Sequence, residues 1–181
     1  MKCPNCKQND LAPKELEKGL VGAGCTTCGG VLLPLMNYRY WQDIHSSSIE
    51  PWDETVEVKT EDSSGDGAKF CPKCNRFMSK YRIGLERDNR VELCANCDEA
   101  WLDTGEWQLL KCLDLHNHLP DIFTDAYQRE LRKKQQREKW DMHFEKEIGA
   151  EDFERVRQFK IWLDDHDSFT EIKHYLNINF D

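Results

Sequence analysis

The sequence predicts a small metal-bound α+β protein, in which two four-cysteine units built on short antiparallel β-hairpins are joined by an acidic linker and followed by a C-terminal helical region. Three observations predict this class. Eight of the nine cysteines fall into four Cys-x-x-Cys pairs. In the second cysteine unit, the stretch between the two Cys-x-x-Cys pairs has the alternating apolar residues typical of strands. The C-terminal part has apolar residues at helical spacing. The expected first cysteine unit, linker, second cysteine unit and helical region are residues 1–42, 43–68, 69–112 and 113–181.

Composition limits the class of protein. The chain has 181 residues and a formal net charge of −9, which argues against a general affinity for the phosphate backbone of nucleic acids and favours protein partners. No apolar run approaches the roughly 20 residues that cross a bilayer, and the opening MKCPNCKQND lacks the apolar stretch of a secretory signal. We therefore expect a cytoplasmic protein without membrane contact, in which cysteines coordinate metal rather than form disulfides.

The cysteine spacing predicts two metal sites. Eighteen residues separate Cys6 from Cys25 and nineteen separate Cys74 from Cys94, which matches the pattern of zinc ribbons. Two zinc ions are expected, with iron as a minority alternative, and four protein ligands would make each metal structural rather than catalytic. The predicted ligands are Cys3, Cys6, Cys25 and Cys28 in the first site and Cys71, Cys74, Cys94 and Cys97 in the second.

The second unit is predicted to contain a β-hairpin. In residues 77–94, apolar side chains alternate with polar ones on both sides of a turn-forming Arg-Asp-Asn; they are Tyr81, Ile83, Leu85, Val91 and Leu93. The Ala-Trp-Leu of residues 100–102 is expected to add a third strand, with Trp101 over a small core. The corresponding stretch of the first unit is rich in glycine, so its strand pairing is less defined.

Two acidic residues follow the third strand. Asp103 stands where a helix N-cap belongs, and Glu106 three residues later completes the pattern of a capping box. The same pair could be a catalytic acid and base, but no histidine or nucleophile lies beside it and a four-thiolate metal has no open position. We therefore expect capping and predict no catalytic residue. Cys112, near the end of this helix, is expected to be a buried small side chain, with a thiol sensor as the alternative.

Several stretches resemble a known family. CPKCNRFMSKYRIG and LCANCDEAWLDTGEWQLLK resemble the transcription-factor-IIB-type zinc ribbon of many bacterial proteins of unassigned function. The WLDxGE signature of that family is matched by Trp101, Leu102, Asp103, Gly105 and Glu106. MKCPNC, CTTCGGVLLPLMNYRYW, LHNHLPDIFTDAYQ and FERVRQFKIWLDDH are similar to a group of bacterial double-ribbon proteins, although Val31 and Leu32 replace a frequent aromatic residue. The resemblance implies zinc binding without known catalysis, and it does not establish a role in transcription.

The segment between the cysteine units, residues 43–68, is strongly acidic and contains a single lysine, Lys59. This composition favours a flexible tether. In the alternative, PWDETVEV docks as an extended strand on a cysteine unit or a partner, because Trp52, Val56 and Val58 lie partly on one face.

The C-terminal region is expected to be helical. Thr124 is a plausible N-cap for a long helix that ends before Gly149, a second helix spans about residues 151–165, and a third starts at a capping box on Ser168 and Glu171. The apolar stripes of these helices are expected to bury against each other; they are Trp140, Phe144 and Ile148 on the first helix and Phe153, Val156, Phe159, Trp162 and Leu163 on the second.

Residues 129–139 of the long helix carry six basic and two acidic side chains. A solvated helix face is the default explanation of such a stretch. Contact with nucleic acid or with an acidic protein is the alternative, and the nucleic-acid contact would use Arg132, Lys133, Lys134 and Arg137.

These observations favour a non-enzymatic zinc-ribbon adaptor that presents surfaces to a protein partner or to the machinery of transcription or translation. The alternative is a nucleic-acid-binding protein, in which the basic helix segment and Lys7, Lys73 and Arg76 of the cysteine loops contact the backbone. A weaker alternative is redox chemistry or metal handling by the thiolates. No cofactor besides the metal is expected, because phosphate-cradling and Ser/His/Asp motifs are absent from the sequence. The pair His116 and His118 has no third ligand nearby in the sequence and is expected at a surface or helix end.

Overall fold

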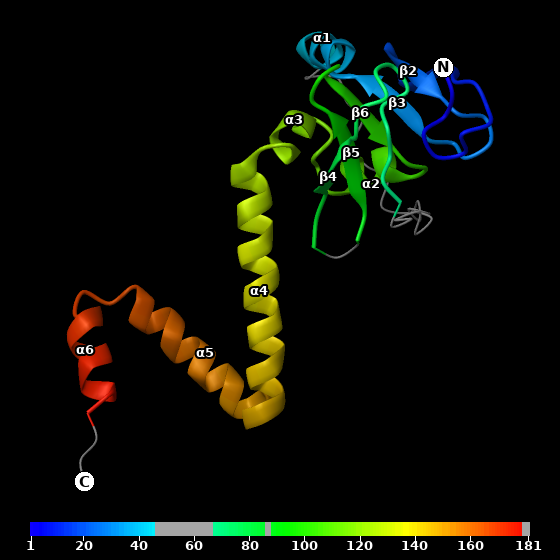
Figure 1. The fold of residues 1–181 in the computed structure, drawn as a ribbon. Helices are drawn as coiled ribbons and strands as arrows, with labels where there is room; N and C mark the ends of the chain where they lie inside the picture. Colours follow the sequence, from blue (N-terminus) through cyan, green and yellow to red (C-terminus); the bar gives the residue numbers. More distant parts are fainter. Residues whose placement is uncertain (46–66, 86–87, 179–181) are drawn as a thin grey trace. The chain divides into compact units, whose positions relative to one another are not determined.

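The computed structural model describes residues 1–45, 67–85 and 88–178 (Figure 1), and the chain forms two compact units, Met1–Arg132 and Lys133–Asp181. The first unit holds the strands and both cysteine groups, whereas the second consists of helices. The predicted α+β class is therefore confirmed. Most of the predicted linker, including Trp52, Val56 and Val58, lies outside the described residues.

The strands of the described residues form one antiparallel sheet in the order β1-β2-β3-β6-β5-β4. The strands are β1 (Ala12–Glu17), β2 (Leu20–Gly24), β3 (Val31–Pro34), β4 (Ser79–Arg82), β5 (Arg90–Cys94) and β6 (Glu99–Leu102). The two four-cysteine units meet where β3 pairs with β6, and there Leu32 lies opposite Trp101 and Leu33 opposite Ala100. Both hairpins that the sequence predicts thus belong to a single sheet.

The local strand predictions for the second cysteine unit are confirmed. Strands β4 and β5 form the expected hairpin, with Tyr81 opposite Val91, and β6 adds the third strand, with Leu93 opposite Ala100. In the first cysteine unit, Gly30 has a steric role. A side chain on Gly30 would begin only 2.4 Å from Cζ2 of Trp101, so the close packing of this tryptophan requires glycine at that position.

Both faces of β6 are covered, since successive side chains of a strand point to opposite sides and every residue of β6 is buried. On β6, Ala100 and Leu102 join the larger core, while Trp101 joins the cluster that contains the cysteines. Three helices contribute to the larger core, and they are α1 (Leu35–His45), α2 (Glu106–Cys112) and α3 (Leu119–Ile122). Trp101 is fully buried beside Leu32 and Met78, which confirms its predicted place over a small core.

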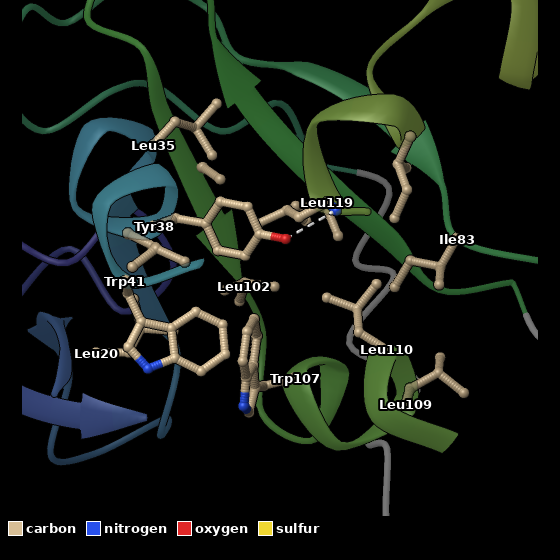
Figure 2. Close-up of a cluster of buried hydrophobic side chains, with 14 residues drawn as sticks. Leu20, Leu35, Tyr38, Trp41, Ile83, Leu102, Trp107, Leu109, Leu110 and Leu119 are labelled. Carbon is tan, nitrogen blue, oxygen red and sulfur yellow. Dashed lines mark hydrogen bonds between the residues drawn. The ribbon is translucent and has the colours of Figure 1, made fainter. Parts of the chain in front are cut away.

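Three aromatic side chains form the centre of the larger core (Figure 2). Trp107 packs edge-on against both Tyr38 and Trp41, with ring centroids 6.5 and 6.0 Å apart. Their polar atoms are paired, as buried aromatic residues require: the hydroxyl of Tyr38 donates to the carbonyl of His116 at 2.6 Å, and the indole of Trp41 donates to the carbonyl of Lys18 at 3.1 Å. Helix α1, which the sequence analysis does not predict, supplies two of the three rings.

The helices of the C-terminal region begin and end close to their predicted bounds. They are α4 (Asp125–Ile148), α5 (Ala150–Asp164) and α6 (Phe169–Leu176). Thr124 caps α4 as predicted, because its Oγ1 accepts a hydrogen bond from the backbone N–H of Tyr127 at 3.2 Å. The capping box on Ser168 is not formed, since its side chain makes no cap hydrogen bond.

The predicted mutual burial of the helical stripes is wrong. Among the described residues of α4, α5 and α6, only Leu163 is buried, whereas Trp140, Phe159 and Trp162 are 41–52% exposed. A single residue, Gly149, connects α4 to α5. Antiparallel helix hairpins use connections of about two to five residues, so this short connection disfavours the packing of the two stripes against each other.

Candidate metal centres

The structure brings the predicted cysteine ligands together in two groups. The first cysteine group is Cys3, Cys6, Cys25 and Cys28, the second is Cys71, Cys74, Cys94 and Cys97, and within each group the sulfur atoms all lie within 4.8 Å of one another. Individual Sγ–Sγ distances are 3.6 Å for Cys3 and Cys28 and 3.5 Å for Cys74 and Cys94. Tetrahedral zinc with bonds near 2.3 Å places its sulfurs about 3.8 Å apart. Both groups therefore have the size and donor set of a metal site.

The backbone shapes each Cys-x-x-Cys loop in the same way. The residue after the second cysteine has a positive φ in all four loops, and these residues are Lys7, Gly29, Asn75 and Asp98. The loop is closed by a backbone hydrogen bond, such as that from Lys7 N to Cys3 O or from Asn75 N to Cys71 O, both 2.8 Å. Glycine, asparagine and aspartate tolerate the left-handed region. The residue type at three of these four positions is therefore a further indication of the loop, besides the spacing of the cysteines.

The thiols differ in acidity according to their surroundings. Burial raises the pKa of Cys3 and of Cys71 to about 12. The backbone N–H of Arg76 is the largest influence on Cys74 and lowers its pKa to about 7. For Cys25, burial raises the pKa, but hydrogen bonds from the backbone N–H groups of Cys28 and Thr27 and from the thiols of Cys28 and Cys3 together bring the value to about 7. A bound cation would deprotonate all four thiols of a group, because metal ligation requires thiolates.

A buried ionic network lies beside the second cysteine group, and we call it the Lys69 network. The ammonium of Lys69 is 2.7 Å from Oε1 of Glu92 and 2.6 Å from Oδ2 of Asp103. The other carboxylate oxygen of Asp103 accepts the indole N–H of Trp101 at 2.8 Å, and Glu106 accepts the backbone N–H of Asp103 at 2.8 Å. Lys69, Glu92, Asp103 and Glu106 are all buried. Sequence reasoning does not identify Lys69 or Glu92 as members of a site.

The predicted N-cap role of Asp103 is wrong. Helix α2 has Gly105 at its N-cap, with φ 84°, and no side chain caps it by a hydrogen bond. The physical reason is competition, because the ammonium of Lys69 and the indole of Trp101 each bind one oxygen of the Asp103 carboxylate. One half of the capping box remains, since the Glu106 side chain still accepts the N–H three residues before it.

The carboxyl of Glu106 should make stability depend on pH. Burial is the main cause that raises its pKa from 4.5 to about 8; Asp103 and Glu92 also raise it, whereas the Asp103 N–H and Lys69 lower it. The folded protein therefore keeps this proton up to about pH 8, while the unfolded chain loses it near pH 4.5. The contribution of Glu106 to the free energy of unfolding is largest below pH 4.5. It decreases as pH rises to about 8, by at most about 1.4 kcal/mol per pH unit.

Glu106→Gln tests this expectation, because glutamine can still accept the N–H of Asp103 but does not ionise. We expect the free energy of unfolding of the variant, minus that of the natural protein, to increase by about 2 kcal/mol between pH 6 and pH 8. Urea unfolding of both metal-loaded proteins measures this difference, in which the pH dependence of metal binding cancels. A difference that stays constant over this interval would contradict the raised pKa.

The remaining candidate residues stay outside the two cysteine groups. Cys112 is exposed, so the prediction of a buried small side chain is wrong. His116 is buried, and neither of its ring nitrogens has a hydrogen-bond partner, whereas Nδ1 of His118 lies 3.2 Å from Asp121. Neither histidine belongs to a metal-binding group of the described residues. The basic residues of 129–139 lie on α4, which buries none of its described side chains.

Comparison of the chain with protein-family models, with curated proteins and with solved structures finds no match. The resemblance to transcription-factor-IIB-type zinc ribbons therefore stays a prediction that rests on the sequence motifs. In the described ranges, no helix combines the length and the apolar character of a membrane span.

Proposed function

We propose that this protein is a non-enzymatic adaptor, in which two structural zinc ions hold a rigid sheet and the C-terminal helices present an apolar surface to a protein partner. The donor set supports the zinc assignment, because four thiolates suit zinc and leave it no open position for a substrate. Iron would fit the same ligands. The adaptor role is supported by the helices rather than by the metal sites.

The observation that carries the proposal is the exposed apolar surface of the second unit. We call it the helical stripe, and its exposed large side chains are Trp140, Met142, Phe144, Ile148, Val156, Phe159, Ile161, Trp162, Tyr175 and Leu176. Scattered single apolar residues are normal on a protein surface, but these ten large exposed side chains all lie on α4, α5 and α6. Aromatic residues contribute much of the binding energy in protein interfaces, and here Phe159 and Trp162 lie in ring contact at 5.4 Å.

Substitution on the helical stripe tests the proposal. The metal-loaded protein, immobilised in native extract with and without nuclease, should retain the same partner in both conditions. The double change Phe159→Ser and Trp162→Ser should reduce that capture about tenfold or more, since interface aromatics commonly contribute about 2 kcal/mol or more each. Lys160→Ser, an exposed position on the same helix, is the matched control and should retain the partner.

Two outcomes would overturn the adaptor proposal. Capture that disappears on nuclease treatment would favour the nucleic-acid alternative through Arg132, Lys133, Lys134 and Arg137. Self-association of the purified chain, measured by sedimentation and abolished by the same double change, would make the helical stripe an interface between copies of this chain.

A further inference from the structure

A groove separates the two cysteine groups on the surface of the first unit. Its volume is about 570 Å³, and it is bordered by one Cys-x-x-Cys loop from each group. The side chains that determine its character are Lys2, Pro4, Lys7, Phe70, Pro72 and Lys73. Since these residues come from both groups, the pairing of β3 with β6 in one sheet brings the two sides of the groove together.

The groove presents lysines although the chain is acidic. Apart from the cysteines, which become thiolates when a metal binds, every charged side chain among the described residues that line the groove is a lysine. Lys2 is paired with Asp10 at 3.1 Å, but both side chains are more than 60% exposed, and such pairs exchange easily with other ions because they contribute little free energy. Lys73 contacts Glu99. Lys7 is exposed at the end of the first loop. The lysines thus offer cationic groups to an anionic ligand.

Phe70, which lines this groove, forms an exposed aromatic pair with Phe77. Phe70 and Phe77 are 47% and 56% exposed, and their rings meet edge-on with centroids 6.3 Å apart. An edge-on contact supports the ring of Phe70 without covering both of its faces. Exposed ring faces beside cationic side chains are the combination with which proteins bind single-stranded nucleic acids, where bases stack and phosphates meet lysine or arginine.

We propose that this groove binds a short single-stranded segment of nucleic acid, with a base stacked on Phe70 and phosphates beside Lys2, Lys7 and Lys73. A nucleotide strand supplies one anion and one flat ring per unit, and the groove offers lysines for the anion and the ring of Phe70 for stacking. An acidic peptide would supply the charge but not a ring at each unit. Because the net charge is −9 and only three lysines line the groove, we expect modest, salt-sensitive affinity.

The test uses the full metal-loaded chain and a fluorescent oligothymidylate of roughly ten nucleotides, within the usual size of single-strand sites. Anisotropy should show binding that weakens about tenfold between about 50 and about 150 mM salt, because three phosphate contacts give a slope near −2. Phe70→Leu keeps an apolar side chain without the ring and should weaken binding about tenfold. Lys7→Glu should have a similar effect.

Lys18→Glu is the matched control, since it makes the same charge change at an exposed turn outside the groove, and its affinity should stay within about twofold of the natural protein. Metal content is measured for every variant. If Phe70→Leu loses metal, the comparison of Lys7→Glu with Lys18→Glu decides, because both changes lie at exposed positions.

Four results would overturn the proposal. Absence of binding at low salt would leave the lysines as charges that offset the metal-bound thiolates. Equal affinity for a duplex of the same length would remove the role of stacking. Binding of a tryptophan-containing oligoglutamate in place of the oligonucleotide would assign the groove to an acidic protein segment. Loss of binding on changing Arg132, Lys133, Lys134 and Arg137 to glutamate, with no effect of Phe70→Leu, would place the contact on α4.

Discussion

Replacing Cys94 with serine is expected to remove the metal ion of the second cysteine group and to unfold strands on both sides of the β3–β6 pairing. Cys94 is buried, lies at the end of β5, and its sulfur is 3.5 Å from that of Cys74. Structural zinc sites contribute about 10 to 16 kcal/mol to folding. Since typical domains are stable by only about 5 to 15 kcal/mol, losing a large part of this contribution should unfold the sheet.

The shared sheet makes this prediction specific. Residues of both four-cysteine units pack in one core, and Leu32 of β3 lies opposite Trp101 of β6. We therefore expect elemental analysis to find two zinc ions in the natural protein and one or fewer in the variant. Amide hydrogen exchange should show lost protection in β2 and β3 as well as in β5 and β6.

Cys112→Ser is the matched control for Cys94→Ser. Cys112 is exposed and lies outside both cysteine groups, so this variant should keep two ions and the stability of the natural protein. If Cys94→Ser lost protection only in the second cysteine unit, while β2 and β3 stayed protected, the two cysteine units would be independent despite the pairing of β3 with β6.

Local chemistry explains what could be predicted from the sequence. The ligand groups follow from spacing, because a Cys-x-x-Cys loop is a short segment whose geometry depends little on the rest of the chain. The β4–β5 hairpin follows from the alternation around Tyr81 and Val91, since only one side of these strands needs to be apolar. The N-cap of α4 at Thr124 could be predicted because a capping side chain contacts backbone groups only a few residues away in the sequence.

Contacts between distant segments explain what was missed. The β3–β6 pairing joins segments about seventy residues apart in the chain. The apolar residues 100–102 predict a strand, but nothing near them in the sequence indicates that β3 is its second partner. Lysine and glutamate usually lie at the surface, and nothing in the sequence around Lys69 and Glu92 indicates that they are buried. An amphipathic pattern predicts a helix with one apolar face, but it does not show whether the connection at Gly149 allows that face, including Trp162, to pack against α4.

Lys69→Met should be the most destabilising change within the Lys69 network. Lys69 is the cation between Glu92 and Asp103, at 2.7 and 2.6 Å, and both carboxylates are buried. Methionine fills a similar volume, so the loss is mainly electrostatic and leaves two buried carboxylates without a counter-ion. Breaking buried ion pairs by removing one partner costs about 3 to 5 kcal/mol, and we expect at least the upper end of this range in urea unfolding.

Asp103→Asn should cost less than Lys69→Met but should not be neutral. The amide can still accept the indole N–H of Trp101, and Lys69 keeps its pair with Glu92, yet one buried ion pair is lost. The double variant should be less destabilised than the sum of the two single changes, because both remove the same interaction. An N-cap role for Asp103 gives a different result, with Asp103→Asn nearly neutral and no coupling to Lys69. Additive effects in this cycle would contradict the pairing of Lys69 with Asp103 and favour the cap.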